Sequence, residues 1–402
     1  MKKNWEEKKL VDVCELITCG VAARPKYVDE GVPFLSAKNV KNGKIIWNGY
    51  NHISKQTHEE LTKNNKPLLG DILYTRVGSY GEAAVIEDNV EFSVFVSLTL
   101  IKVNKSILNN HFLKHYLNTN IIKTLAKKSI SGSGVGNLNV GTVREFPIPI
   151  PPLSEQQWIV TVLDETFSVI AKAKENAEKN LQNARELFAS YLQSVFTNSC
   201  ESWERKTLGE VLQKTENVNP SLQPNTDFTY IDISSVNNDL FTIETVSVLK
   251  GKEAPSRARK LIRENDVIFA TVRPTLKRIA IIPKEYDKQV CSTGYFVLRG
   301  KELIENKLLY YYLQTDLFMT NMEKLQKGAS YPAVTDGEVR GQMIAFPKSL
   351  CEQKHILAKL DGLSAETKKL EAIYKQKIAN FEELKKSILQ KAFNGELKGA
   401  QT

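Results

Sequence analysis

Cysteine is scarce in this chain, and the few cysteines are scattered. The 402 residues include only five. Zinc and redox sites built from thiols need closely spaced pairs such as Cys-x-x-Cys, and the sequence contains none. The odd number also does not suit a framework of disulfides. We therefore predict reduced thiols without a metal or redox role at Cys14, Cys19, Cys200, Cys291 and Cys351.

Long hydrophobic runs are missing as well. No stretch approaches the roughly eighteen consecutive apolar residues that a membrane-spanning helix needs. Residues 1–7 include lysines, but no apolar segment follows them, so the sequence does not begin like a secretory signal. These absences predict a cytoplasmic protein that does not enter a membrane.

Motifs for nucleotide and methyl-group chemistry are absent. A P-loop reads Gly-x-x-x-x-Gly-Lys-Ser/Thr, but the Gly-Lys pairs at 43–44 and 251–252 are followed by isoleucine and glutamate. Residues 219–222, Asn-Pro-Ser-Leu, lack the second proline and the aromatic ring of the Asn/Asp-Pro-Pro-Tyr/Phe motif of amino-methyltransferases. No nuclease-like cluster of acidic residues and lysine is repeated. We expect neither catalysis nor a bound cofactor in this chain.

One histidine pair has metal-ligand spacing. His111 and His115 lie at i, i+4 in an expected helix, but no third ligand accompanies them in the sequence. We expect packing or surface roles for both and predict no metal site.

What the sequence does contain is an excess of positive charge. Its 55 lysines and arginines outnumber 46 acidic residues, and the formal net charge is +9 with a pI near 9.0. This balance suits a polyanionic partner, because lysine and arginine near phosphates release condensed counterions. In other respects the composition, 42% hydrophobic and 25% charged, is typical of a globular protein.

The chain is also duplicated over its whole length. Trp5 and Trp203 each precede a leucine segment, and Leu-Ser-Glu-Gln at 153–156 corresponds to Leu-Cys-Glu-Gln at 350–353. The separation between corresponding features stays between 195 and 198 residues. We therefore divide the chain into a first globular domain (1–150), a first long helix (151–199), a second globular domain (200–348), and a second long helix with a C-terminal tail (349–402).

Both globular domains have the same predicted elements in the same order. Runs of β-branched and aromatic residues predict strands, and glycine and serine predict loops. The first domain has strands at 71–77, 83–86 and 92–103, a helix at 110–128 and a loop at 131–137. The second has strands at 266–272, 278–282 and 294–298, a helix at 307–317 and a loop at 327–332. Each domain is therefore expected to be mixed α/β.

Two long helices follow the globular domains. After a double proline at 151–152, Ser154 and Gln157 form a capping-box pattern that predicts a helix from Ser154 to about Phe196. Its counterpart is expected at 351–393. Roughly forty-three helical residues span about 65 Å. Because the first helix leads into the second domain and the second helix starts there, we expect an antiparallel pair related by a pseudo-two-fold axis, with the chain ending near its start.

Apolar residues recur with 4-3 alternation in the second helix, interrupted only at Lys377, as is typical of a coiled-coil seam. Shifting this register back by 197 residues gives the seam of the first helix. The predicted seam residues are Ile159, Leu163, Ile170, Leu187, Tyr191, Ile356, Leu360, Leu363, Leu370, Tyr374, Phe381, Leu384 and Ile388. The expected fold class is α+β, with two similar mixed α/β globules joined by an antiparallel two-helix coiled coil.

Two basic globules held apart by a stiff rod suit DNA, where two contact modules lie at a defined spacing along the groove. Because the globules differ in sequence, the expected target is asymmetric. Two alternatives stay open. A duplicated coiled-coil scaffold that does not bind DNA would leave the basic balance unexplained, and a self-sufficient nuclease or methyltransferase would lack a motif.

The sequence resembles the specificity subunits of type I restriction-modification systems over essentially its whole length. The resemblance is carried by Pro-Pro-Leu-Ser-Glu-Gln at 151–156 with Ile159, by the second copy at 350–353 with Ile356, and by the tryptophans that begin each half. The second copy departs from the pattern at 346–349, where Phe-Pro-Lys-Ser stands in place of the double proline.

This resemblance implies a subunit without catalysis of its own. Its two target-recognition domains would read the two halves of a bipartite double-stranded DNA site, and the helices would set the unread spacer. The family also implies two modification (methyltransferase) subunits that carry S-adenosylmethionine, and restriction subunits, when present, that hydrolyse ATP with Mg²⁺.

Candidate DNA-contacting residues are polar side chains in or beside turns, with arginine suited to guanine and asparagine to adenine. In the first domain they are Lys38, Asn39, Arg76, Ser79, Tyr80, Ser131, Ser133 and Asn137. In the second they are Ser234, Asn237, Arg257, Arg259, Arg273, Lys277, Lys327 and Tyr331. For each, an ordinary solvated surface role is the alternative.

Overall fold

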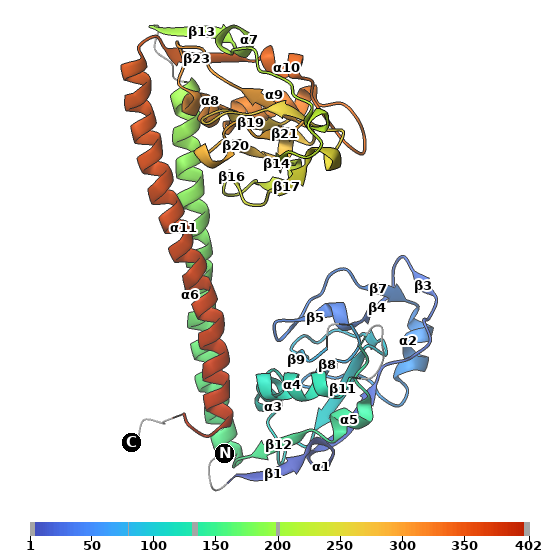
Figure 1. Ribbon diagram of the computed structural model, residues 1–402. Helices are drawn as coiled ribbons and strands as arrows, with labels where there is room; N and C mark the ends of the chain where they lie inside the picture. Colours follow the sequence, from blue (N-terminus) through green and yellow to red (C-terminus); the bar gives the residue numbers. More distant parts are fainter. Residues whose placement is uncertain (1–4, 79, 131–135, 198–201, 398–402) are drawn as a thin grey trace. The chain divides into compact units, whose positions relative to one another are not determined.

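The computed structural model describes residues 5–78, 80–130, 136–197 and 202–397. The chain divides into two compact units: unit 1 is Met1–Glu178 with Gln376–Thr402, and unit 2 is Lys179–Lys375. Each unit contains one globular part and one half of each long helix, α6 (Leu153–Thr197) and α11 (Leu350–Phe393) (Figure 1). The long helices are therefore shared between the units.

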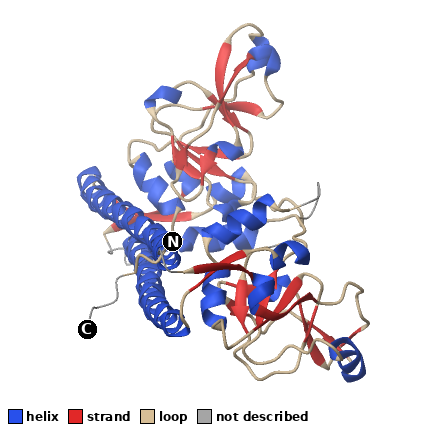
Figure 2. Cartoon of the chain, turned by 90° about the horizontal axis from the view of Figure 1, so that it is seen from below, coloured by secondary structure: helices blue, strands red, loops and turns tan. Residues whose placement is uncertain are grey.

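The globular part of unit 1 is a mixture of short helices and strands (Figure 2). Its strands are β1 (Glu6–Lys9), β2 (Cys14–Cys19), β3 (Tyr27–Val28), β4 (Val32–Leu35), β5 (Val40–Lys41), β6 (Lys44–Ile45), β7 (Asn51–Ile53), β8 (Ile72–Thr75), β9 (Ala83–Val85), β10 (Ser93–Val94), β11 (Leu98–Val103) and β12 (Pro147–Ile150). Its helices are α1 (Leu10–Val13), α2 (Lys55–Thr62), α3 (Asn110–Leu117), α4 (Asn120–Lys128) and α5 (Val140–Arg144).

Unit 2 has a similar order of elements, although no α-helix corresponding to α2 occurs among its described residues. Its strands are β13 (Trp203–Thr207), β14 (Asp227–Ile231), β15 (Val236–Asn237), β16 (Thr242–Ile243), β17 (Ser247–Lys250), β18 (Ala258–Leu261), β19 (Val267–Ala270), β20 (Ile279–Ile281), β21 (Val290–Ser292), β22 (Tyr295–Leu298) and β23 (Met343–Pro347). Its helices are α7 (Leu208–Val211), α8 (Asn306–Leu313), α9 (Asp316–Leu325) and α10 (Asp336–Arg340).

An antiparallel sheet forms the centre of each globular part. In unit 1 the strand order is β2-β11-β8-β9, and in unit 2 it is β20-β19-β22. Ile101 in β11 lies opposite both Ile17 and Ile72, and all three are buried because both faces of this sheet are covered. The predicted strands at 71–77 and 83–86, and all three of unit 2, are confirmed as β8, β9, β19, β20 and β22.

Three predicted elements are corrected because each is interrupted. The predicted strand at 92–103 is two strands in different sheets, β10 and β11. The predicted helix at 110–128 is α3 and α4, because the side chain of Thr119 caps a new helix by accepting a hydrogen bond from Ile122 N. Thr315 does the same between α8 and α9, so the predicted helix at 307–317 also breaks.

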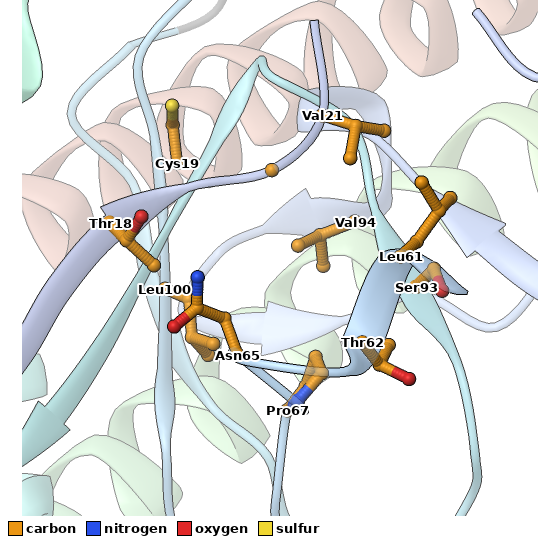
Figure 3. A pocket seen from close by; sticks show the side chains of 11 residues that line it. Thr18, Cys19, Val21, Leu61, Thr62, Asn65, Pro67, Ser93, Val94 and Leu100 are labelled. Carbon is orange, nitrogen blue, oxygen red and sulfur yellow. The ribbon is translucent and has the colours of Figure 1, made fainter. Parts of the chain in front are cut away.

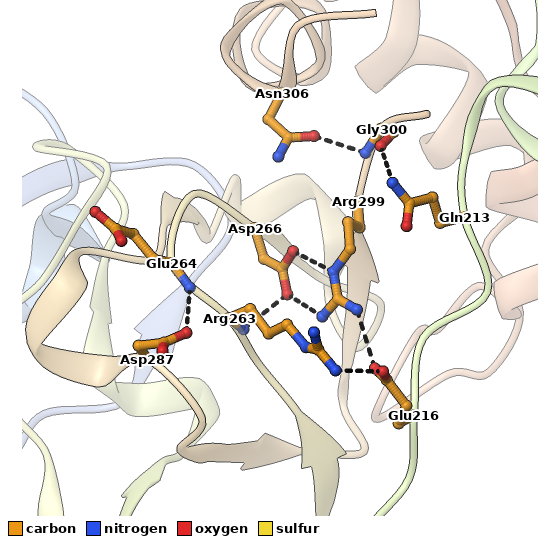
Figure 4. A network of polar contacts seen from close by, with 9 residues as sticks. All are labelled: Gln213, Glu216, Arg263, Glu264, Asp266, Asp287, Arg299, Gly300 and Asn306. Atoms are coloured by element: carbon orange, nitrogen blue, oxygen red, sulfur yellow. Dashed lines mark hydrogen bonds and ion pairs between the residues drawn. The ribbon is translucent and has the colours of Figure 1, made fainter. Parts of the chain in front are cut away.

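A carboxylate, buried in unit 2 and half-buried in unit 1, anchors the turn before the central strand of each unit. Asp266 is 1% exposed and accepts two hydrogen bonds from Arg299, at 2.8 and 2.7 Å, and a third from the backbone N of Arg263 at 2.8 Å (Figure 4). Glu216 pairs with both arginines, and Arg299 lowers its pKa. In unit 1 the equivalent pair is Asp71 and Lys102. The repeated aspartate is therefore a structural residue of the fold.

Within each unit the two long helices pack antiparallel. In unit 1, Lys174 of α6 forms an ion pair with Glu382, while Lys385, further along α11, lies over the ring of Phe167, which precedes Lys174. The end of α11 is buried there, with Phe393 in the same core cluster as Trp5, as expected for the end of the chain. In unit 2 the first half of α11 and the second half of α6 share a core cluster and an Arg185–Glu371 ion pair at 3.0 Å.

The coiled-coil seam differs from the predicted register at alternate positions. Buried or half-buried residues follow a 4-3 pattern in both helices, namely Leu163, Phe167, Ile170, Lys174, Ala177, Leu181, Ala184, Phe188, Tyr191 and Val195 in α6, and Leu360, Ser364, Thr367, Glu371, Tyr374, Ile378, Phe381, Lys385, Ile388 and Ala392 in α11. Ile159 and Ile356 are also buried or half-buried. The predicted interruption at Lys377 disappears, because Ile378 occupies that position of the seam.

Four predicted seam residues are exposed instead: Leu187 (71%), Leu363 (39%), Leu370 (40%) and Leu384 (46%). The residue that follows each of them lies in the seam. Hydrophobicity misled the prediction because polar residues such as Glu371 and Lys385 have partners on the facing helix.

The start of α6 also differs from its prediction. The helix begins at Leu153, and the backbone N of Gln156 donates to the carbonyl of Pro152 at 3.0 Å. Gln157 accepts a hydrogen bond from the side chain of Asn109, at 2.9 Å, rather than serving a capping box with Ser154. Among the described residues, no helix is long and apolar enough to cross a bilayer.

Candidate nucleic-acid interface

In each unit the loop after the central strand meets a second, glycine-containing loop. In unit 1, Val77 bridges to Asn137, and the backbone N of Leu138 donates to the carbonyl of Arg76 at 2.8 Å. In unit 2, Val272 bridges to Ala333, and the next residue donates to the carbonyl of Thr271 at 2.9 Å. The same junction of two loops is therefore built twice, and most candidate residues lie in or beside it.

Arg76 holds this junction together in unit 1. Its side chain donates to the carbonyl of Leu138 (2.8 Å), the carbonyl of Val96 (2.9 Å) and Oδ1 of Asn137 (3.0 Å), and the residue is only 7% exposed. The structure corrects the prediction for Arg76, because these bonds turn the guanidinium inward. Oδ1 of Asn137, another candidate, already accepts the hydrogen bond from Arg76.

Asn39 is the second correction in unit 1. It is 1% exposed, donates to the carbonyls of Ile46 and Asn48, and accepts from the backbone N of Ser36. Its neighbour Lys38 is exposed and remains a candidate. Tyr80 is half-buried against the core of unit 1. Three further candidates, Ser79, Ser131 and Ser133, lie outside the described residues.

Several candidates in unit 2 also have local structural roles. Oδ1 of Asn237 accepts from the backbone of Asp239 and Leu240, which closes a turn. Arg259 is half-buried and donates to the carbonyl of Ala258 at 2.8 Å. Ser234 and Arg257 are exposed.

The remaining candidates of unit 2 gather at the two loops. Arg273 is exposed, donates to the carbonyl of Ser330 at 3.2 Å, and lies 4.9 Å from the centre of the Tyr331 ring. Tyr331 is 71% exposed. Lys277 and Lys327 form exposed ion pairs, with Asp316 and Glu338 respectively, that contribute little to stability and can be exchanged for other anions. This group is accessible and cationic.

Two glutamines that carry a structural role were not among the predicted site residues. Gln156 is fully buried at the start of α6; it accepts from the backbone N of Asn109 and donates to the carbonyls of Ile107 and Pro151, all at 2.8 to 2.9 Å. Gln353 of α11 makes the same three contacts in unit 2, with Glu305, Leu303 and Pro347. The Glu-Gln pair that recurs at 155–156 and 352–353 was the sequence feature that could have indicated this structural role.

Glu155 and Glu352, which precede these glutamines, also attach the long helices to the globular parts. The indole of Trp5 donates to Glu155 at 3.2 Å, and that of Trp203 donates to Glu352 at 3.1 Å. Each long helix is therefore tied to the first strand and the central helices of its own globular part, which fixes its direction there.

Buried histidines distinguish unit 1. Burial lowers the pKa of His58, of His111 and of His115, and for His115 this effect outweighs the opposing hydrogen bond to Asp164 at 2.7 Å. His111 and His115 belong to the packed surface of α3, and among the described residues no group of three or more potential ligands is arranged to hold a metal.

Acid is therefore expected to destabilise unit 1 more than unit 2. The folded-state pKa of each buried histidine lies below the unfolded value of about 6.5, so the unfolded chain binds more protons and stability falls as the pH drops below about 6.5. Each such histidine contributes up to about 1.4 kcal/mol per pH unit. Hydrogen exchange, corrected for intrinsic rates, at about pH 7.5 and about pH 5.5 measures this loss.

His115→Gln should weaken this acid sensitivity, whereas His355→Gln serves as the matched control because His355 is exposed and is the single histidine of unit 2. An equal loss of protection in both units would contradict the prediction.

The small cavity in unit 1 does not suit a cofactor. It has a volume of about 100 Å³ and lies between the end of β2 and α2, lined among others by Cys19, Thr62 and Ser93 (Figure 3). Small-molecule sites usually have volumes of about 300–1,000 Å³. Ser93 is instead bonded to His58, at 2.9 Å, so its hydroxyl serves the core.

Fold and site together define a class: a duplicated α+β protein in which two similar units present different loops and share a pair of antiparallel helices. A family model of the type I restriction modification DNA specificity domain matches residues 2–181 and again residues 200–380. The chain therefore belongs to this family and contains two copies of the domain, which confirms the predicted resemblance.

Known relatives agree over nearly the full length. The chain is 22% identical to the type I restriction enzyme MjaVIII specificity subunit of Methanocaldococcus jannaschii, over 98% of this chain and 93% of that protein. It has the fold of an HsdS subunit from Thermoanaerobacter tengcongensis (TM-score 0.61, 19% identity, 99% and 98% covered). A chain from a structural study of complex assembly and conformational transition in the type I R-M system is also similar (TM-score 0.79, 19% identity, 99% of both covered).

Proposed function

We propose that this chain is the non-catalytic, sequence-reading subunit of a cytoplasmic type I restriction-modification complex. Unit 1 and unit 2 each read one half of a bipartite double-stranded DNA site, and the long helices set the length of the unread spacer. The target is asymmetric because the two reading surfaces differ.

One observation carries this proposal: the same scaffold presents different loops in the two units. The junction of loops is built on equivalent backbone bonds, yet unit 1 closes it with the buried Arg76 and unit 2 displays the exposed Arg273 and Tyr331. Binding and recognition residues concentrate on loops held by a rigid scaffold. The scaffold alternative without DNA binding would not account for a match to a DNA specificity domain.

Partner subunits would supply the chemistry. Apolar side chains on the outer faces of the helices, including Val169 at 69% exposure in unit 1 and Leu187 at 71% in unit 2, support docking of two modification subunits there. S-adenosylmethionine would be bound by those subunits, and ATP with Mg²⁺ by restriction subunits. The relatives' designation as specificity subunits of restriction enzymes supports this division of labour.

Shortening both helices by one heptad tests the proposed spacer. Deleting residues 175–181 and 375–381 together keeps the Lys174–Glu382 and Arg185–Glu371 ion pairs in register. Seven helical residues span about 10 Å, which corresponds to about three base pairs. Sequencing of DNA selected from random duplexes by the chain with its modification subunits should show a shorter spacer and the same half-site bases.

Replacing the residues of the same two segments that lie outside the seam, without changing the length, is the control and should leave the spacer unchanged. Altered half-site bases in the shortened variant would refute the assignment of spacing to the helices. If the chain retains no DNA at any salt concentration, the scaffold alternative is favoured instead.

A further inference from the structure

The loops that follow the central strands differ at two equivalent positions with unusual backbone geometry. In unit 1 these are Gly78 (φ 79°) and Gly81 (φ 87°), and in unit 2 they are Arg273 (φ 51°) and Lys277 (φ 52°). The hydrogen bonds establish the correspondence: the backbone N of Gly78 donates to the carbonyl of residue 136, and that of Arg273 donates to the carbonyl of residue 332. In the same way, the backbone N of Thr75 donates to the carbonyl of Glu82, which follows Gly81, and that of Ala270 donates to the carbonyl of Arg278, which follows Lys277. Both cations of unit 2 therefore stand where unit 1 has glycine.

This geometry is unfavourable for side chains. A left-handed conformation costs free energy for residues with a Cβ, and residues with such strain cluster at functional sites. Space does not explain the difference, since a Cβ added at Gly78 would meet nothing within 4 Å. A side chain at this position points into open space, and unit 2 places an arginine there.

The arginine is oriented by its neighbours. Its guanidinium lies 4.9 Å from the centre of the Tyr331 ring and donates to the carbonyl of Ser330 at 3.2 Å, while Tyr331 as a residue is 71% exposed. Stacking on an aromatic face restricts the plane of a guanidinium, which prepares its donor fork for a planar acceptor pair. In double-stranded DNA, O6 and N7 of guanine form such a pair in the major groove.

We infer that Arg273, held by Tyr331, reads a guanine in the half-site of unit 2, and that Lys277 contacts a nearby phosphate. This inference rests on the proposed function. Glycine has no side chain with which to make either contact, so unit 1 lacks both contacts at these two positions. This difference would make the two half-sites different.

The test compares Arg273→Gly, which installs the residue of unit 1, with Asn265→Gly. Asn265 also has positive φ (67°), and its counterpart in unit 1 is Gly70 (φ 89°), so both changes relieve the same kind of backbone strain. Both variants should unfold at an equal or higher temperature than the parent. Only Arg273→Gly should lose preference for guanine, by about 10- to 100-fold at one position of one half-site.

Arg273→Lys separates base reading from charge. A lysine keeps the positive charge but lacks the planar fork, so overall DNA binding should persist while the preference for guanine is weakened. Tyr331→Phe should keep the preference because the ring remains, and Tyr331→Ala should weaken it. All variants are assayed as the full chain with its modification subunits, by sequencing duplexes selected from a random pool.

The outcomes are distinct. If the parent chain enriches a bipartite sequence and Arg273→Gly leaves every base preference unchanged, this inference is overturned and the proposed function stands. A uniform loss of affinity across all sequences that Arg273→Lys restores would likewise overturn it, since that pattern identifies a phosphate contact. If the parent enriches no sequence, the proposed function itself fails.

Discussion

Replacing Asp266 by alanine should lower the unfolding free energy of unit 2 by about 3–5 kcal/mol. The carboxylate is 1% exposed and accepts three hydrogen bonds, so its removal leaves the Arg299 guanidinium without its bidentate partner and the backbone N of Arg263 without an acceptor. A loss of this size lowers the melting temperature of a unit of about 200 residues by about 10 °C. Calorimetry and hydrogen exchange resolved to the two units measure it.

Glu216→Ala is the matched control, because Glu216 binds the same two arginines but its side chain is 44% exposed. Exposed ion pairs contribute about 1 kcal/mol or less, so this variant should unfold nearly like the parent. If both variants lose a comparable unfolding free energy, burial of the Asp266 carboxylate is not the reason for its contribution to stability. Unit 1 should keep its protection in both.

Elements with strong local signals were predictable from sequence. The central strands at 72–75 and 267–270 are short and rich in apolar residues, and the long helices have a period that extends over more than forty residues. Interruptions were not predictable, because they depend on single side chains. Thr119 ends one helix and starts another through one hydroxyl, and its apolar neighbours continue the helical spacing regardless.

The register of the long helices shows a second limit. Positions separated by multiples of seven residues, such as Leu360, Tyr374 and Phe381, belong to both the predicted seam and the observed one. At the seam positions between them, two adjacent residues compete. Hydrophobicity selects Leu370, whereas the structure places the half-buried Glu371 in the seam beside Arg185. An ion pair between two helices cannot be predicted from the sequence of either helix alone.

The loops that carry most candidate residues were predictable from the sequence, but the exposure of each candidate was not. Loops rich in glycine and cations remain the predicted contact region, and Arg273 is exposed in one of them. Arg76 has the same residue type in the same loop, yet its guanidinium is turned inward by three acceptors that lie 20 or more residues away in sequence. Backbone correspondence aligns Arg273 with Gly78, not with Arg76, and this required the structure.

Replacing Gln156 by methionine should loosen the attachment of α6 to the globular part of unit 1. The change keeps the volume but leaves the backbone N of Asn109 and the carbonyls of Ile107 and Pro151 without partners in a fully buried place. Each unsatisfied group costs about 1–3 kcal/mol, so the total loss should be several kcal/mol. Gln353→Met should have the same effect in unit 2, because its three contacts are equivalent.

The functional consequence should be a wider range of accepted spacer lengths with unchanged half-site bases, since the direction of the helix is affected and the reading loops are not. Sequencing of selected duplexes measures both. Gln157→Met is the matched control, because the side chain of this exposed neighbour makes one hydrogen bond among the described residues, with the side chain of Asn109. Gln156→Glu keeps the acceptor for the backbone N of Asn109 but loses both amide N–H donors. Its stability and its range of accepted spacer lengths should therefore lie between those of the parent and of the methionine variant. A Gln156→Met chain with parental stability and a sharp parental spacer would show that the buried amide does not position the helix.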